Sequence, residues 1–105
     1  MPTVSHAFAF RPRPGHLDAF LKELARINAF VKRAGGRMRA WNEVSGSNPG
    51  AIGVVIENDD WKGYGAYRSK LDADPEFQKL RAEISSRKDP LAEFLASAMS
   101  EEVPS

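Results

Sequence analysis

The chain has 105 residues, of which 42% are hydrophobic and 28% are charged, and its formal net charge is +1. These values are ordinary for a globular protein and predict one domain that spans residues 1–105. The chain contains no cysteine, which excludes disulfides, a thiolate nucleophile and a cysteine-ligated metal.

Charge is distributed unevenly along the chain. Residues 1–50 carry eight basic and three acidic side chains, whereas residues 51–105 carry seven basic and eleven acidic ones. Such asymmetry indicates a face for anionic ligands, two surfaces that complement each other across a symmetric interface, or two solvated faces of opposite sign. No segment approaches the ~18 apolar residues of a membrane span or begins like a signal peptide, so we expect a cytoplasmic protein with no membrane partner.

The first predicted element is a strand over residues 3–11. Its side chains alternate between two faces. The bulky face consists of Val4, His6, Phe8 and Phe10, and the small face consists of Ser5, Ala7, Ala9 and Arg11. The small face predicts that another layer lies close against it. Pro12 and Pro14 then end the strand, because proline lacks the N–H that a strand ladder uses.

Residues 16–33 give the clearest helical pattern. Apolar residues recur at intervals of three and four, at Leu17, Phe20, Leu21, Leu24, Ile27 and Val31. Asp18 lies in the predicted first turn and Lys32 and Arg33 in the last, as the helix dipole favours. Gly35 and Gly36 follow and predict a left-handed end to the helix.

A hairpin is predicted next. Residues 37–44 alternate, residues 45–50 are rich in turn formers, and an apolar, β-branched run follows at Ile52, Val54, Val55 and Ile56. Such a run predicts a central strand that is buried on both faces. The helices of one chain offer a single covering layer, so we expect a second copy to supply the other.

Two helical segments follow the hairpin. Asp59 or Asp60 caps the first, in which one face is formed by Trp61, Tyr64, Arg68 and Leu71. Asp74 caps the second, Pro75 takes its favoured first position, and the apolar stripe consists of Phe77, Leu80 and Ile84.

Residues 91–103 fit two structures. Their Ala, Leu, Glu and Met content favours a helix. A strand over residues 94–102 would instead complete a four-stranded sheet, and we adopt the strand for that reason.

The resulting order of elements, βαββαβ, is ferredoxin-like and belongs to the α+β class. Further features are Arg13-Pro14-Gly15 before the long helix, Asn42-Glu43 in the hairpin, Trp61 after the third strand and Asp74-Pro75-Glu76-Phe77 at the second helical segment. With these features the chain resembles the dimeric α/β-barrel superfamily, in particular its NIPSNAP-like and antibiotic-biosynthesis-monooxygenase-like domains. The resemblance implies a homodimer whose two sheets form a barrel, and a cleft for a small apolar or aromatic ligand. It also implies, for some members, oxidation without a metal or organic cofactor.

The candidate site residues follow from that expectation. His6, among aromatic residues, is the candidate acid or base, and Phe8, Asn42, Trp61 and Tyr64 are candidates for lining the ligand cleft. Each has a structural alternative, namely a histidine, tyrosine or tryptophan that only packs in the core. The haem-degrading members of the superfamily use an Asn, a Trp and a His, of which the His lies on the second helix. This chain has no histidine after Trp61, so it lacks that haem ligand.

Two further functions compete with ligand binding. Lys62-Gly63-Tyr64-Gly65-Ala66-Tyr67 resembles part of the RNA-recognition-motif signature, although Ala66 replaces an aromatic residue and this half of the chain is acidic. A non-catalytic structural or interaction module of the same fold is the other alternative. The two histidines are ten residues apart and the carboxylates are scattered, so no metal site is expected. We expect neither a cofactor nor a nucleic-acid partner.

Overall fold

The computed structural model describes residues 2–104. Its elements, in chain order, are β1 (Val4–Pro12), α1 (Leu17–Ala34), β2 (Arg37–Asn42), β3 (Ile52–Asn58), α2 (Trp61–Ala73), α3 (Pro75–Ser85) and β4 (Ala92–Glu101). The four strands form one antiparallel sheet in the order β2-β3-β1-β4. This arrangement confirms the predicted α+β, ferredoxin-like class.

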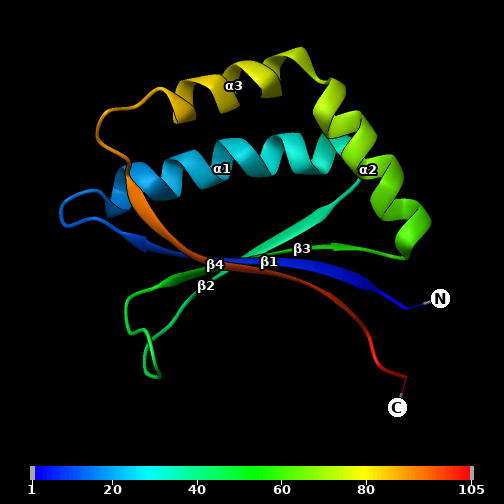
Figure 1. Ribbon diagram of the computed structural model, residues 1–105, viewed down its shortest axis with the longest axis horizontal. Helices are drawn as coiled ribbons and strands as arrows, with labels where there is room; N and C mark the ends of the chain where they lie inside the picture. The colour runs from blue at the N-terminus through cyan, green and yellow to red at the C-terminus, as the bar shows by residue number, and fades with distance from the viewer. Residues whose placement is uncertain (1, 105) are drawn as a thin grey trace.

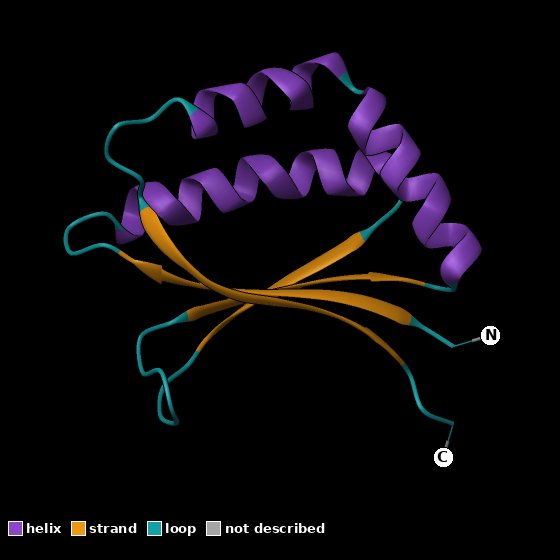
Figure 2. Ribbon diagram, viewed as in Figure 1, coloured by secondary structure: helices purple, strands orange, loops and turns teal. Residues whose placement is uncertain are grey.

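All three helices lie on one side of the sheet (Figures 1 and 2). On β3, every second residue from Ile52 to Asn58 is buried beneath the helices. The residues between them, Gly53, Val55 and Glu57, are only partly covered. The chain's own helices therefore cover one face of the central strand, as expected, and the other face is open in the single chain. The reason is that the chain has too few residues to place a second layer against the sheet.

The core has two neighbouring parts between the sheet and the helices. One part gathers Val31 and Ala34 of α1 with Ile56, Tyr67, Leu71 and Phe77. The other gathers Phe20 and Leu24 of α1 with Ile52 and Val54. Phe8 of β1 packs against both parts, and it thus joins them across the middle of the sheet.

The predicted helix ends are confirmed by their caps. Gly35 ends α1 with φ of 101°, a left-handed conformation in which glycine has no Cβ to clash. The Asp60 side chain accepts a hydrogen bond of 2.7 Å from the Gly63 N–H at the start of α2. Asp74 accepts from the N–H groups of Glu76 and Phe77 at the start of α3, at 3.0 and 3.4 Å. These carboxylates satisfy N–H groups that the first helical turn leaves without partners.

Several strand boundaries differ from the prediction, including those of β4, which covers Ala92–Glu101 where residues 94–102 were expected. β1 includes Pro12, which pairs with Ala92 of β4. Successive backbone nitrogens of a strand point to opposite sides, and the nitrogen of Pro12 points toward β3. The ladder to β3 has already ended at Phe10, so the N–H that proline lacks is not needed there. β2 ends at Asn42 rather than residue 44, although Glu43 still exchanges hydrogen bonds with Gly50 and Ala51 in the hairpin. The predicted strand near the C-terminus is confirmed as β4.

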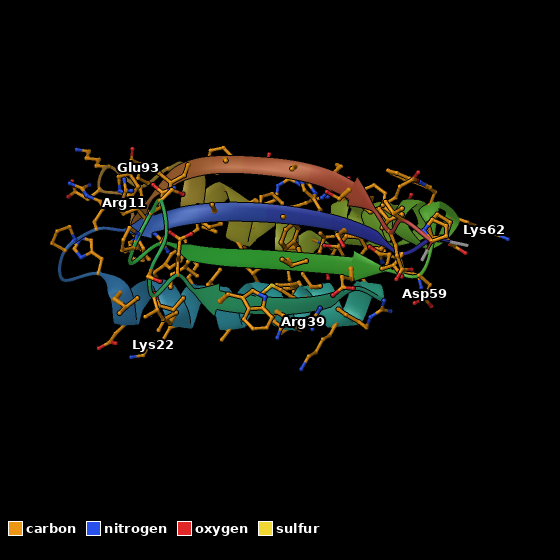
Figure 3. All side chains as sticks on the ribbon, turned by 90° about the horizontal axis from the view of Figure 1, so that it is seen from below. Arg11, Lys22, Arg39, Asp59, Lys62 and Glu93 are labelled. Carbon is orange, nitrogen blue, oxygen red and sulfur yellow. The ribbon has the colours of Figure 1, made fainter. Side chains whose placement is uncertain are left out.

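Ion pairs join the two oppositely charged parts of the chain. Basic residues of the first 50 pair with carboxylates of the rest in Arg11–Glu93, Arg26–Glu83, Arg33–Asp74, Arg37–Asp59 and Arg39–Glu57. Figure 3 shows Arg11 and Glu93 together at one end of the sheet and Asp59 at the other. The charge asymmetry of the sequence therefore becomes a set of contacts within one chain rather than two faces of opposite sign.

Candidate functional site

A cavity of about 200 Å³ lies between the sheet and the helices. Every element except β4 contributes to its lining, which consists of Phe8, Phe10, Leu24, Ile27, Val31, Met38, Val54, Ile56, Tyr67, Arg68, Leu71 and Phe77. The lining residues are apolar apart from Tyr67 and Arg68, which carry a hydroxyl and a guanidinium and both belong to α2. This is the composition of a small-molecule site, in which a few polar groups orient a ligand inside an apolar pocket.

His6 lies beside this cavity rather than in its lining. Its imidazole stacks on the ring of Phe8, with the ring centroids 4.1 Å apart. Partial burial lowers the pKa of His6 below its ordinary value, and the positive charge of Arg68 lowers this pKa further. The imidazole is thus neutral at pH 7 and able to accept a proton.

Trp61 and Tyr64 extend the aromatic contacts of the cavity residue Tyr67 away from the cavity. The indole N–H of Trp61 donates a hydrogen bond of 2.6 Å to the Glu101 carboxylate, which ties the start of α2 to the end of β4. The Trp61 ring meets Tyr64 edge-on at 5.9 Å, and Tyr64 lies 6.3 Å from Tyr67. Trp61 is 49% exposed, so it closes the edge of the fold without being part of its core.

Asn42 lies apart from the other predicted site residues. Asn42 is in register with Ile52 and Phe10, whereas His6 is in register with Ile56. Four residues of strand, about 13 Å, thus separate their levels along the sheet. Asn42 instead lines an open groove of about 400 Å³ beside the edge strand β2, with Leu17, Leu21, Ala40, Trp41, Gly50 and Ile52.

Tyr67 and Arg68 are the polar cavity residues that the sequence analysis did not include among the candidate site residues. Tyr67 is 3% exposed, and its burial raises the pKa of its phenol to about 12, so the hydroxyl stays protonated at neutral pH. Arg68 was placed on the correct face of α2 but given no role. The sequence pattern that could have identified both residues is their spacing, because each lies within about one helical turn of Tyr64 on the side of α2 that meets the sheet.

Three other kinds of binding were considered from the sequence: to RNA, to a metal ion and to a membrane. The segment Lys62–Tyr67 lies in α2, so it cannot act as the sheet strand that the RNA-recognition signature requires. Among residues 2–104, no three side chains of the kinds His, Cys, Asp and Glu gather to hold a metal ion. No helix in that same range is long and apolar enough to cross a membrane.

Comparisons with known proteins link the chain to a fold through structure, not through sequence. No protein-family model matches the sequence, and a search of curated proteins finds no significant match. Among solved structures, an uncharacterised NIPSNAP domain protein from Burkholderia xenovorans superposes with a TM-score of 0.69 at 21% identity, over 97% of this chain and 94% of that one.

Two further structures carry descriptions that refer to chemistry. A variant of SnoaB, a cofactor-independent oxygenase from Streptomyces nogalater, gives a TM-score of 0.61 at 18% identity, over 97% of this chain and 92% of that one. A Bacteroides thetaiotaomicron protein described as a possible oxidoreductase gives 0.64 at 11% identity, over 96% and 98%. The chain thus has the fold of NIPSNAP-like and monooxygenase-like domains, which confirms the resemblance drawn from its sequence.

Proposed function

We propose that this protein binds a small apolar or aromatic molecule in the cavity between the sheet and the helices. The observation that carries the proposal is a cavity of about 200 Å³ with an apolar lining, to which α2 contributes two polar residues, Tyr67 and Arg68. Apolar contact supplies the affinity for such a ligand, and the two polar groups orient it.

Ligand titrations followed by NMR test the proposal. Indole and benzyl alcohol are suitable neutral probes, and Ile27→Phe fills part of the cavity from α1. We expect Ile27→Phe to weaken binding at least tenfold. Leu21→Phe is the matched control, because Leu21 lies on the same helix but lines the groove beside β2. Affinities that are equal in the wild type and Ile27→Phe would show that the probes bind elsewhere, and an absence of binding would favour a structural or interaction module.

A catalytic form of this proposal rests on His6. In this form a neutral imidazole next to Phe8, a cavity residue, accepts the proton of a bound phenol; the contact of His6 with Phe8 supports the assignment. A phenolate is electron-rich enough to react with oxygen directly. Conversion of a phenol to a quinone takes up one oxygen atom, releases the second as water and draws all four electrons from the substrate. The fold shared with the cofactor-independent oxygenase SnoaB is consistent with this chemistry.

Oxygen uptake with electron-rich phenols and quinols measures this activity. We expect His6→Ala to slow uptake, because the substrate then loses its proton acceptor. Equal rates for the wild type and His6→Ala would remove His6 from the mechanism while leaving ligand binding intact.

We also propose that the open face of the sheet pairs with a second copy of the chain. This face carries small residues along its centre, at Ser5, Ala7, Ala9, Gly53, Val55, Ala96 and Ala98. In Figure 3, which views the sheet from that side, no helix covers it. Small side chains allow another sheet to approach closely, and burial of this face would give β3 the second covering layer that its sequence predicts.

A further inference from the structure

Arg68 is the one charged residue among those that line the cavity, within the described part of the chain. It comes from the middle of α2 and is partly buried. The other lining residues are aliphatic or aromatic, or methionine. The Arg68 side chain is 40% exposed, and its guanidinium attracts an anion through charge and through directed N–H donors.

The charges around Arg68 leave it able to bind an anion. Its Nη2 donates to the two carboxylate oxygens of Asp72, at 3.2 and 3.5 Å. Arg81 binds the same carboxylate from α3, at 3.3 Å. Two guanidinium groups thus share one carboxylate, and the cluster keeps one net positive charge. Only one terminal nitrogen of Arg68 is used by Asp72, so its other N–H groups are available to a ligand.

Tyr67 adds a neutral hydrogen-bond donor next to Arg68. Because the phenol stays protonated at neutral pH, it is able to donate to a ligand oxygen. Both residues line the same cavity, and a guanidinium together with a hydroxyl suits the two oxygens of a carboxylate.

The cavity volume limits the rest of the ligand. A benzene ring occupies an apolar protein cavity of about 150 Å³. The cavity here, of about 200 Å³, therefore holds one ring together with a small polar substituent. Two fused rings with a polar substituent exceed it.

We propose that the cavity selects a single-ring aromatic monocarboxylate, with the ring among the apolar lining and the carboxylate on Arg68 and Tyr67. The inference rests on the proposed function, since it assigns a chemical class to the ligand of the same cavity. It adds a charge requirement that binding of a neutral aromatic molecule does not have.

A comparison of benzoate with benzamide tests this charge requirement. The two molecules have nearly the same size and shape, but only benzoate is charged at pH 7.5. We expect the wild type to bind benzoate at least tenfold more tightly than benzamide in NMR titrations at low chloride. Arg68→Gln should remove the difference by weakening benzoate alone, and its retained affinity for benzamide shows that the variant still has its cavity.

Arg81→Gln is the matched control for net charge. Arg81 also binds Asp72 but does not line the cavity, so Arg81→Gln should keep most of the preference for benzoate. Equal affinities of the wild type for benzoate and benzamide would overturn the charge requirement and leave the proposed function standing. A loss of preference as large in Arg81→Gln as in Arg68→Gln would also overturn it, since the effect would then come from overall charge. Failure of the wild type to bind benzoate, benzamide and the neutral probes would overturn both proposals.

Discussion

Gly36 lies between α1 and β2 and packs against side chains of α1 and α2. A Cβ at Gly36 would lie 2.9 Å from Cε1 of Tyr67 and 2.9 Å from Cγ1 of Val31, both of which line the cavity. Such distances are shorter than van der Waals contact, so any side chain here must displace a core residue. The sequence analysis assigned Gly36 to the helix end, where its N–H donates to the Val31 carbonyl at 2.9 Å, and the structure adds close packing as a second role.

Two glycine substitutions should therefore change stability in opposite directions. Gly36→Ala should lower the free energy of unfolding by about 1–3 kcal/mol, because it overpacks the core against Tyr67. Gly65→Ala should raise it by up to about 1 kcal/mol, because Gly65 lies inside α2 with open space around it and alanine favours helix. Urea unfolding followed by circular dichroism measures both. Equal effects of the two substitutions would contradict the packing role of Gly36.

His6 should make stability depend on pH. Its folded-state pKa lies below the ordinary value of 6.5, so the unfolded chain binds the proton more readily. The contribution of His6 is complete above pH 6.5 and is lost as the pH falls through the lower pKa of the folded state. Between pH 7.5 and 5.5 the wild type should lose more stability than His6→Gln, by at most about 1 kcal/mol because the imidazole is partly exposed. Parallel losses in the two proteins would contradict this shift.

The candidate site could be predicted from the sequence only in part. Alternation along β1 correctly places His6 and Phe8 on the same face of the sheet, but it does not indicate that this is the face covered by the helices. Whether Tyr64 or Tyr67 reaches the cavity depends on the tilt of α2 against the sheet, which a helical period does not specify. The separation of Asn42 from His6 depends on strand register, which arises from pairing between distant segments.

Among the elements, α3 depends most clearly on its first residue. Asp74 accepts two backbone hydrogen bonds there and also forms an ion pair of 3.3 Å with Arg33 of α1. Asp74→Ala should lower the free energy of unfolding by about 0.5–2 kcal/mol, the usual loss for a helix cap. Asp74→Asn keeps the cap but not the ion pair, and it should lose less than Asp74→Ala. If both variants lose the same stability in urea unfolding, the ion pair rather than the cap stabilises α3.

β4 shows how partners override local preference. Its Ala, Leu, Glu and Met content favours a helix, yet residues 92–101 pair with β1 along the whole of that strand. The central position of β1 requires a neighbour on this side, and no other segment is free to supply it. The prediction of a strand succeeded because it considered the sheet as a whole, whereas propensity alone indicates the wrong structure.

The whole molecule is asymmetric, with helices on one side of a sheet whose other side is open (Figure 2). The chain should therefore sediment at micromolar concentration as a species of two chains of 11.6 kDa each. Ala7→Glu places a charge at the centre of the open face and should weaken association at least tenfold, because that charge would be buried without a partner. Ala25→Glu, on the exposed side of α1, adds the same charge and should leave association unchanged. A monomeric wild type would contradict the pairing.

The pairing of β1 with β4 has a consequence for synthesis on the ribosome. β1 is made first, but its partner on one side is β4, residues 92–101. The nascent chain therefore has an unpaired β1 edge until these residues have been synthesised. A transcript that stops before residue 92 would yield a product whose sheet has β1 at its border. Such a product is expected to aggregate through that border or to be degraded by cellular proteases.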